Sequence, residues 1–124
     1  MIAGLEGRGL DAHYLGYFEC FNQSLFYEAH DVLEELWLGC RGQSDDLFYK
    51  GLIQFAGAFV HLQKGRLRPA AALFKLARAN LERFPSVHHR LEVAAILGLI
   101  EEWLGWLELN GFADNPLMNQ SPPL

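Results

Sequence analysis

Cysteine is scarce in this chain, and long apolar runs are missing. The 124 residues include two cysteines, Cys20 and Cys40, which have no CxxC spacing and no cluster of cysteines and histidines around them. This pattern is typical of reduced thiols in a cytoplasmic protein. The richest apolar run, Val93–Ile100, is far shorter than the roughly 20 residues that cross a membrane. The first ten residues also lack the apolar block of a signal peptide, so we expect a cytoplasmic protein that does not bind membranes.

The motifs of common catalytic sites are missing as well. The chain has no HExxH sequence, no glutamate followed by histidine three residues later, and no glycine-rich phosphate loop. Neither cysteine has a histidine near it in sequence, and the expected helices offer no positions for a serine–histidine–aspartate arrangement. The sequence therefore favours a protein that is not an enzyme, and it identifies no small-molecule ligand.

Charge is distributed unevenly along the chain, although the net charge is only −5. Residues 47–91 contain eight basic residues and one acidic residue, whereas the rest contains two basic and fourteen acidic residues. An excess of basic charge can mark a nucleic-acid partner, but no groove-reading motif and no run of interleaved aromatic residues accompanies it here. We therefore expect no nucleic-acid binding, and we expect the acidic and basic segments to complement each other in the fold or in an oligomer.

Apolar residues recur every three or four positions through most of the chain, which predicts helices and no strand. Residues 1–9 are expected to be a loose N-terminus, and residues 110–124 an irregular C-terminal tail. Asp11 is the expected N-cap of the first helix, and Asp45 or Asp46 that of the third. The expected helices are Ala12–Phe21, Leu25–Leu38, Leu47–Lys64, Ala70–Phe84 and Val87–Leu109. They predict one all-α domain over residues 1–124, a compact bundle of about five helices.

The third and fourth expected helices have distinct patterns. The third is apolar on nearly every side, which is typical of a buried central helix, and Gly51 and Gly57 would let a neighbouring helix approach it closely. The fourth is expected to turn Leu73, Leu76, Ala77 and Leu81 inward. His88 and His89 follow far along the chain, and we expect both to be exposed.

A weak internal repeat relates the first two helices to the third and fourth. With an offset of 41 residues, Ser24 matches Gly65 and Phe18 matches Phe59, and further apolar positions match around them. The pattern is similar to the helical hairpins of tetratricopeptide repeats, although the offset is longer than their usual period. We interpret it as two antiparallel helical hairpins packed together, distantly tetratricopeptide-like.

The residues of greatest chemical interest lie in the second helix. His30, Glu34 and Trp37 are spaced at i, i+4 and i+7, so they share one helix face with apolar packing residues. Antiparallel packing of the second helix against the third would bring Gln54 and His61 level with this face. The candidate site therefore consists of Glu28, His30, Glu34, Trp37, Gln54 and His61.

Two interpretations of this polar string are open. A buried polar group without a partner costs about 1–3 kcal/mol, so the first is a buried hydrogen-bonded network that fixes helix packing. The second is a mononuclear metal site with His30, Glu34 and His61 as ligands, because imidazole and carboxylate suit zinc, iron or manganese. Such a site would have hydrolytic potential. We favour the network, in a protein that acts through self-association or protein interaction.

Two segments in order resemble a known family. They are FNQSLFYEAHDVLEELW, which contains the HxxxExxW pattern as His30, Glu34 and Trp37, and YKGLIQFAGAFVHLQKG, followed by PAAALFKLARANL. Over roughly Tyr17–Phe84 the chain is similar to the bacterial and archaeal family called domain of unknown function 309. Asp31 stands where the family pattern suggests glutamate, and Ser24 where it suggests glycine. The resemblance implies a compact helical bundle of no established activity, with a motif suggested to bind metal.

The last expected helix carries apolar residues over more than half of its circumference. Such a surface either closes the core of the bundle or forms an interface between copies of the chain. We therefore expect a homo-oligomer. The apolar residues concerned are Ile96, Leu99, Ile100, Trp103, Leu104, Trp106 and Leu107.

Overall fold

The structure is a computed structural model that describes residues 11–109 and 111–118. The predictions for residues 1–9, and those for residue 110 and residues 119–124 of the tail, lie outside this part. The helices are α1 (Ala12–Asn22), α2 (Phe26–Gly39), α3 (Asp46–Gln63), α4 (Leu67–Leu81) and α5 (Val93–Leu109). A short hairpin of β1 (Val87–His88) and β2 (Leu91–Glu92) and the 3-10 turn η1 (Pro116–Met118) complete the elements.

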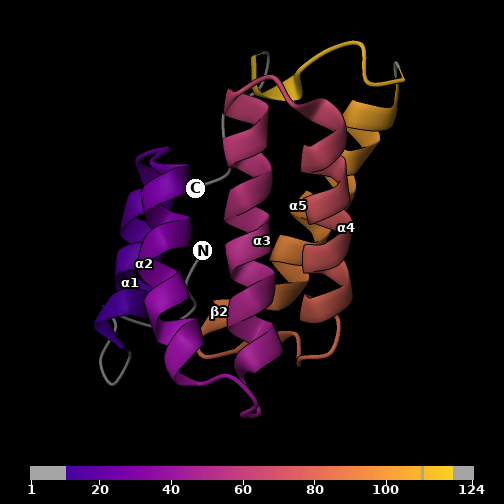
Figure 1. The fold of residues 1–124 in the computed structure, drawn as a ribbon. Coiled ribbons are helices and arrows are strands. Elements are labelled where there is room, and N and C mark those ends of the chain that lie inside the picture. Colours follow the sequence, from indigo (N-terminus) through magenta and orange to yellow (C-terminus); the bar gives the residue numbers. More distant parts are fainter. Residues whose placement is uncertain (1–10, 110, 119–124) are drawn as a thin grey trace.

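Each helix packs against its neighbours in the chain: α1 on α2, α2 on α3, α3 on α4, and α4 on α5. Figure 1 shows α3 in the middle, with α1 and α2 on one side of it and α4 and α5 on the other. The first four helices form two antiparallel hairpins. The predicted all-α class and its hairpin construction are therefore confirmed.

The core is centred on α3, as its apolar sequence predicts. Phe55 and Phe59 of this helix are fully buried and contact aromatic rings on both sides of it. Phe21 stacks on Phe55 at 5.4 Å between ring centroids, and Trp103 of α5 meets Phe59 edge-on at 4.9 Å. Because burial of one such side chain stabilises the fold by about 1.5–3 kcal/mol, this aromatic cluster holds the two hairpins together.

The two hairpins turn in the same way, at the positions that the internal repeat pairs. Ser24 and Gly65 both have positive φ, 62° and 71°. In the first turn the Leu25 N–H donates to the Cys20 carbonyl at 2.9 Å. In the second turn the Arg66 N–H donates to the His61 carbonyl at 2.8 Å. This is the usual way to satisfy the last carbonyls of a helix. The Gln63 side chain also donates to the Ser24 carbonyl at 3.2 Å, which links the two turns.

Close packing of α3 on α4 depends on two glycines, as predicted. A Cβ atom placed on Gly51 would lie 2.8 Å from Cγ of Leu81. A Cβ atom on Gly57 would lie 3.1 Å from Cδ1 of Leu73. The missing side chains therefore let the two helix backbones approach each other.

The start of the last helix is one correction to the prediction. Residues Val87–Glu92 were expected to be helical, but they form the β1–β2 hairpin, in which Val87 pairs with Glu92 and His88 with Leu91. His89 and Arg90 at its tip have φ of 47° and 61°, a conformation that a right-handed helix does not allow. The expectation of no strand is therefore wrong in this one segment, and α5 begins at Val93.

Helix α4 also differs from its prediction. It begins at Leu67 and ends at Leu81, three residues earlier at each end than expected. Ala77 and Leu81 are buried as predicted, but Leu76 is 50% exposed. The inward position of Leu76 was therefore wrong, because the buried stripe of α4 runs through Ala70, Phe74, Ala77 and Leu81.

Helix α5 closes the core, which is one of the two roles expected for its apolar surface. Ile96, Ile100, Trp103, Leu104 and Leu107 are all buried within the single chain. Leu99 and Trp106, the other two residues of this surface, are partly buried, so the single chain covers most of the apolar pattern of α5. Self-association stays a prediction, and sedimentation at micromolar concentration would test it.

Opposite charges meet between α4 and α5. Arg78 donates to Glu101 at 2.6 Å, and Lys75 lies 3.4 Å from Glu108. These pairs join the basic middle segment to the acidic end of the chain, as the complementary charge pattern predicts. Within the part of the chain that the structure describes, no helix is both long and apolar enough to span a membrane.

Candidate functional site

Three residues of the predicted site line one cavity between α2, α3 and α4. His30 projects from α2, and Gln54 and His61 project from α3, at the level that antiparallel packing predicted. The cavity has a volume of about 270 Å³. Its lining residues are Tyr27, His30, Ile53, Gln54, Gly57, Val60, His61, Lys64 and Leu73.

The polar groups around this cavity are not joined to one another directly. Within the described residues, no hydrogen bond connects His30, Gln54 and His61, and Oε1 of the Gln54 side chain instead accepts from the Asn80 side chain at 2.7 Å. Nδ1 of both histidines is buried and lacks a hydrogen-bond partner in the described structure. The arrangement is therefore a polar-edged cavity more than a closed network.

Glu34 lies beside His30 at the helix surface. Its carboxylate is 3.8 Å from Nε2 of His30, and the two side chains are 42% and 31% exposed. Glu28, the remaining acidic residue of the predicted string, is also exposed. Within the described residues, His30, Glu34 and His61 do not form a group whose ligand atoms all lie within 4.8 Å of one another. A metal at these three residues stays a prediction.

Trp37 has a local role at the end of α2. Its indole N–H donates to the Asp46 carboxylate, whose other oxygen accepts from the Gly42 backbone N–H at 2.8 Å. Arg41 lies over the indole ring, 5.3 Å from the centroid. The Gly42 N–H, and after it the Trp37 N–H, hold the pKa of Asp46 below its usual value of 3.8. Trp37 therefore fixes the loop between α2 and α3.

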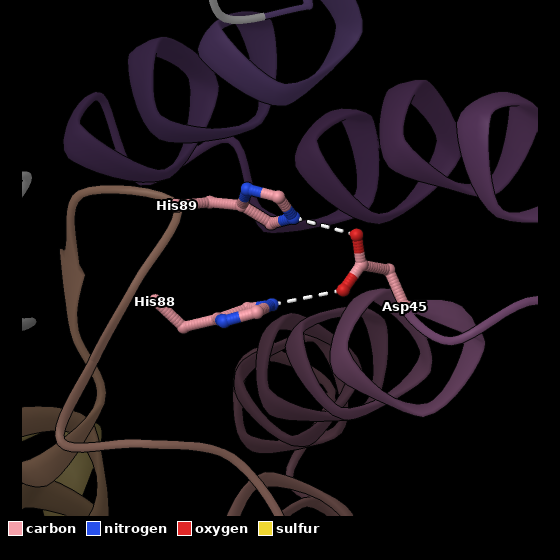
Figure 2. Close-up of side chains that lie close together, drawn as sticks. All are labelled: Asp45, His88 and His89. Carbon is pink, nitrogen blue, oxygen red and sulfur yellow. Dashed lines mark hydrogen bonds and ion pairs between the residues drawn. The ribbon is translucent and has the colours of Figure 1, made fainter.

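A second group of polar side chains gathers where β1 meets the start of α3. Figure 2 shows both imidazoles turned toward one carboxylate: Nε2 of His88 donates to Oδ1 of Asp45 at 2.8 Å, and Nε2 of His89 donates to Oδ2 at 2.7 Å. Their side chains are 24%, 34% and 28% exposed in the order His88, His89, Asp45. We call Asp45, His88 and His89 the triad. Its three ligand atoms all lie within 4.8 Å of one another.

The triad depends on an unusual backbone. Successive residues of a strand point to opposite faces, so adjacent histidines would normally diverge. Here the positive φ of His89 turns its ring back toward the ring of His88, and the two ring centroids are 4.3 Å apart. The Tyr14 hydroxyl of α1 donates to the His89 carbonyl at 3.0 Å and holds this turn in place.

Aromatic rings surround the two imidazoles. Phe48 contacts His88 edge-on at 4.7 Å between centroids, and Tyr49 lies parallel to His89 at 6.1 Å. Burial raises the pKa of the Tyr49 hydroxyl to about 12, so this side chain stays neutral. Burial alone would raise the pKa of Asp45, but the bonds from His88 and His89 outweigh it, and its pKa is lowered. The carboxylate of the triad is therefore charged at neutral pH.

Reasoning from the sequence missed the triad. Asp45 or Asp46 was expected to cap α3. Asp45 occupies the N-cap position, but its side chain makes no capping hydrogen bond, and both of its oxygens accept from histidines. His88 and His89 were expected to be exposed, and this is wrong, because both are partly buried against Phe48. The available signal was the adjacent pair of histidines just after Pro85 and before the last apolar helix.

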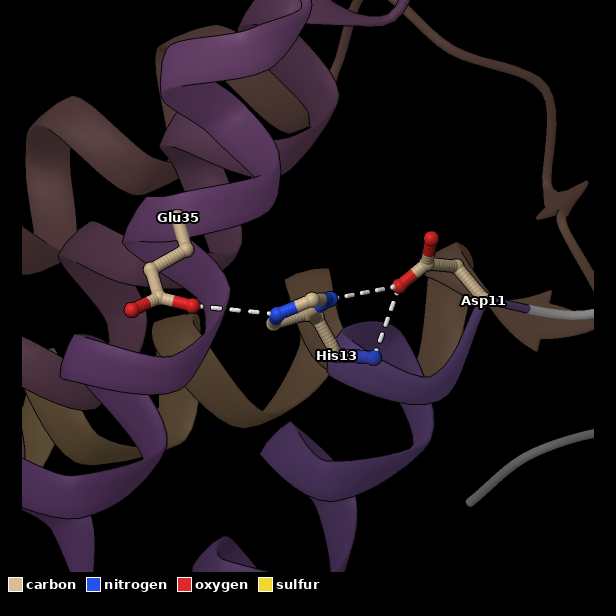
Figure 3. A network of polar contacts seen from close by, with 3 residues as sticks. All are labelled: Asp11, His13 and Glu35. Carbon is tan, nitrogen blue, oxygen red and sulfur yellow. Dashed lines mark hydrogen bonds and ion pairs between the residues drawn. The ribbon is translucent and has the colours of Figure 1, made fainter.

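His13 of α1 also contacts two acids, but in a different geometry. Figure 3 shows Asp11 and Glu35 at opposite edges of its ring, bonded to Nδ1 at 3.1 Å and to Nε2 at 3.0 Å. Asp11 also accepts from the His13 backbone N–H at 2.7 Å, which confirms it as the N-cap of α1. The bond from Asp11, and then that from Glu35, raises the pKa of His13 despite some desolvation. A single ion cannot replace both contacts, so we regard this group as structural.

Comparisons with known proteins agree with the family resemblance. Residues 14–73 match the family described as domain of unknown function DUF309. An uncharacterized protein of Aquifex aeolicus (strain VF5) is 29% identical over 89 residues, which make up 72% of this chain and 27% of that protein. The chain thus spans only about a quarter of that relative. No solved structure matches the chain.

Proposed function

Given that the chain carries a DUF309 domain over residues 14–73, we propose that it is a metal-binding protein whose triad holds one divalent transition-metal ion. The observation that carries the proposal is that two Nε2 atoms and one carboxylate oxygen lie within 4.8 Å of one another, with both imidazoles turned toward the same carboxylate (Figure 2). The ligands come from the start of α3 and from the β1–β2 hairpin, so metal binding would also tie these elements together.

The ligand types favour zinc, iron or manganese. Two imidazoles and one carboxylate are borderline ligands that suit these ions better than calcium or magnesium, which prefer oxygen. Three protein ligands leave at least one coordination position open, which is the arrangement of catalytic more than of structural zinc sites. A water molecule in that position is the group through which such a site performs hydrolytic chemistry.

The residues around the triad hold its side chains in position before any metal binds. Phe48 and Tyr49 pack against the imidazoles, and the Tyr14 hydroxyl fixes the His89 carbonyl. Contacts of this kind orient metal-binding histidines and strengthen binding. The positive φ of His89 costs about 1–2 kcal/mol for a residue with a Cβ, and strain of this kind concentrates at functional sites.

Protein purified without a histidine tag should bind about one equivalent of zinc or manganese in isothermal titration calorimetry. Asp45→Asn and His88→Ala should each weaken this binding by at least about tenfold, because each removes one ligand. Imidazole ¹⁵N spectra should show the protons of His88 and His89 moving from Nε2 to Nδ1 as the metal replaces them.

Two further histidine variants make the test specific. His13→Ala is the matched control, because His13 also contacts two acids but through opposite ring nitrogens. His30→Ala tests the alternative site in the HxxxExxW motif. Both variants should keep the metal. The proposal is refuted if the wild-type protein binds no metal, or if His30→Ala loses it while His88→Ala does not.

A further inference from the structure

The cavity lined by His30 and His61 is a second site, separate from the triad. Ile53, the lining residue of α3 that is nearest to Asp45 in sequence, follows it by eight positions, which corresponds to about 12 Å of helix. Whatever the cavity binds therefore does not contact a metal held by the triad.

The cavity is large enough for a small organic molecule. An engineered apolar cavity of about 150 Å³ holds benzene, and this one measures about 270 Å³. Much of its wall is apolar and comes from Ile53, Val60 and Leu73. Tyr27 adds an aromatic ring at the α2 side. The walls therefore suit one substituted aromatic ring or an aliphatic group of similar size.

The two histidines leave hydrogen-bonding capacity unused. Nδ1 of His30 and Nδ1 of His61 are buried, and neither has a partner in the described structure. A buried polar atom without a partner costs about 1–3 kcal/mol, and native proteins rarely leave one without a reason. Rotation of either ring about its side-chain bonds would present this nitrogen to a polar group of a molecule in the cavity.

The charges around the cavity differ from one end to the other. Near His30 the Glu34 carboxylate, 3.8 Å from Nε2, supplies negative charge. Near His61, burial and then the positive charges of Arg66 and Lys64 lower the imidazole pKa, so this ring stays neutral at pH 7. An anion bound in the cavity would therefore be repelled by Glu34 at the His30 end and attracted by Lys64 and Arg66 at the His61 end.

Lys64 is a cation without an acidic partner in the described part of the chain. The basic residues Lys75 and Arg78 of α4 each pair with a glutamate of α5, at 3.4 Å and 2.6 Å. Among the described residues, no carboxylate lies within 4.0 Å of the Lys64 ammonium group. Lys64 lines the cavity, so its charge is available to a bound molecule.

We propose that this cavity binds a small carboxylic acid with an aromatic or compact aliphatic body. The apolar part lies among Ile53, Val60 and Leu73. The carboxylate lies beside Lys64, within reach of the neutral His61 imidazole, which donates a hydrogen bond to it. The site thus recognises both the size of the apolar group and the negative charge of the acid.

Phenylacetate is a suitable probe, and phenylacetamide is its neutral match of nearly equal shape. Titration of the ¹⁵N-labelled protein with each compound should give saturable shifts in the amide signals of Gly57 and Lys64. Phenylacetate should bind about tenfold more tightly than phenylacetamide, because only the acid gains a charge-assisted contact. The His61 imidazole should titrate at a higher pH in the phenylacetate complex, since the bound carboxylate offsets the charges of Lys64 and Arg66.

Three variants test the assignment of residues. Lys64→Gln changes an exposed side chain and should remove the preference for the acid. Lys75→Gln is the matched control, because Lys75 is equally basic but lies outside the cavity and pairs with Glu108; it should keep the preference. Val60→Phe should fill the apolar part and weaken both compounds. The proposal is overturned if phenylacetate gives no saturable shift up to about 10 mM, if the amide binds equally well, or if Lys64→Gln has no effect.

Discussion

Replacing Ser24 by glycine should stabilise the protein. Ser24 has φ of 62° in the turn between α1 and α2, whereas the corresponding turn between α3 and α4 uses Gly65 with φ of 71°. The left-handed conformation costs a residue with a Cβ about 1–2 kcal/mol. Glycine avoids this cost but loses about 0.5–1 kcal/mol more through the freedom of the unfolded chain. The difference leaves a net stabilisation of about 0.5–1 kcal/mol for Ser24→Gly.

Thermal denaturation followed by circular dichroism would measure this difference. The unfolding entropy of a chain of 124 residues is about 0.26 kcal/mol/K, so the melting temperature should rise by about 2–4 °C. The reverse change, Gly65→Ser, should lower stability by a similar amount, because no atom lies within 4 Å of a Cβ built at Gly65 and only the backbone is affected. Ser24→Ala keeps the Cβ and should change little. A loss of stability in Ser24→Gly, or no change in Gly65→Ser, would refute the reasoning.

Two further predictions concern α3. Gly51→Ala should destabilise the fold by about 1–3 kcal/mol, because the new Cβ would lie 2.8 Å from Cγ of the buried Leu81. Gly57→Ala should cost less, because its new Cβ meets only the tip of the Leu73 side chain. Equal losses of stability in urea denaturation would contradict this prediction. Asp46 has a lowered pKa in the folded protein, so its stabilising effect is present above its unfolded pKa of 3.8 and is lost as pH falls through the lower folded pKa. The stability difference between wild type and Asp46→Asn should therefore be largest near neutral pH and shrink toward about pH 2 in urea midpoints, and a constant difference would contradict the assignment.

Much of the architecture could be predicted because helices follow simple rules. The apolar period gave the helices, and the turn residues gave their approximate ends. The loop between two antiparallel helices constrains their register, so Gln54 could be placed level with His30, and His61 two turns further along α3 in the same polar string. Their detailed contacts could not be predicted, since small rotations of a helix decide whether side chains meet directly or enclose a cavity.

The triad could not be predicted because no single residue type specifies it. The left-handed backbone at His89 is uncommon for a residue with a Cβ, and here the hydroxyl of Tyr14, bonded to the His89 carbonyl, helps to hold it. Asp45 and the histidines are also more than 40 positions apart in the chain. Only the packing of α1, α3 and the hairpin brings them together, and a local sequence pattern cannot predict that packing.

The segment that matches the family contains the whole cavity but only part of the triad. All residues named as lining the cavity, from Tyr27 to Leu73, fall within the matched segment of residues 14–73. The triad crosses its boundary, because Asp45 lies inside this segment and His88 and His89 lie beyond it. A search that relies on this segment alone would therefore retrieve proteins with every position of the cavity but with only the carboxylate of the triad. To find chains that share the triad, one must also require two adjacent histidines about 43 residues after the aspartate, just before the last helix.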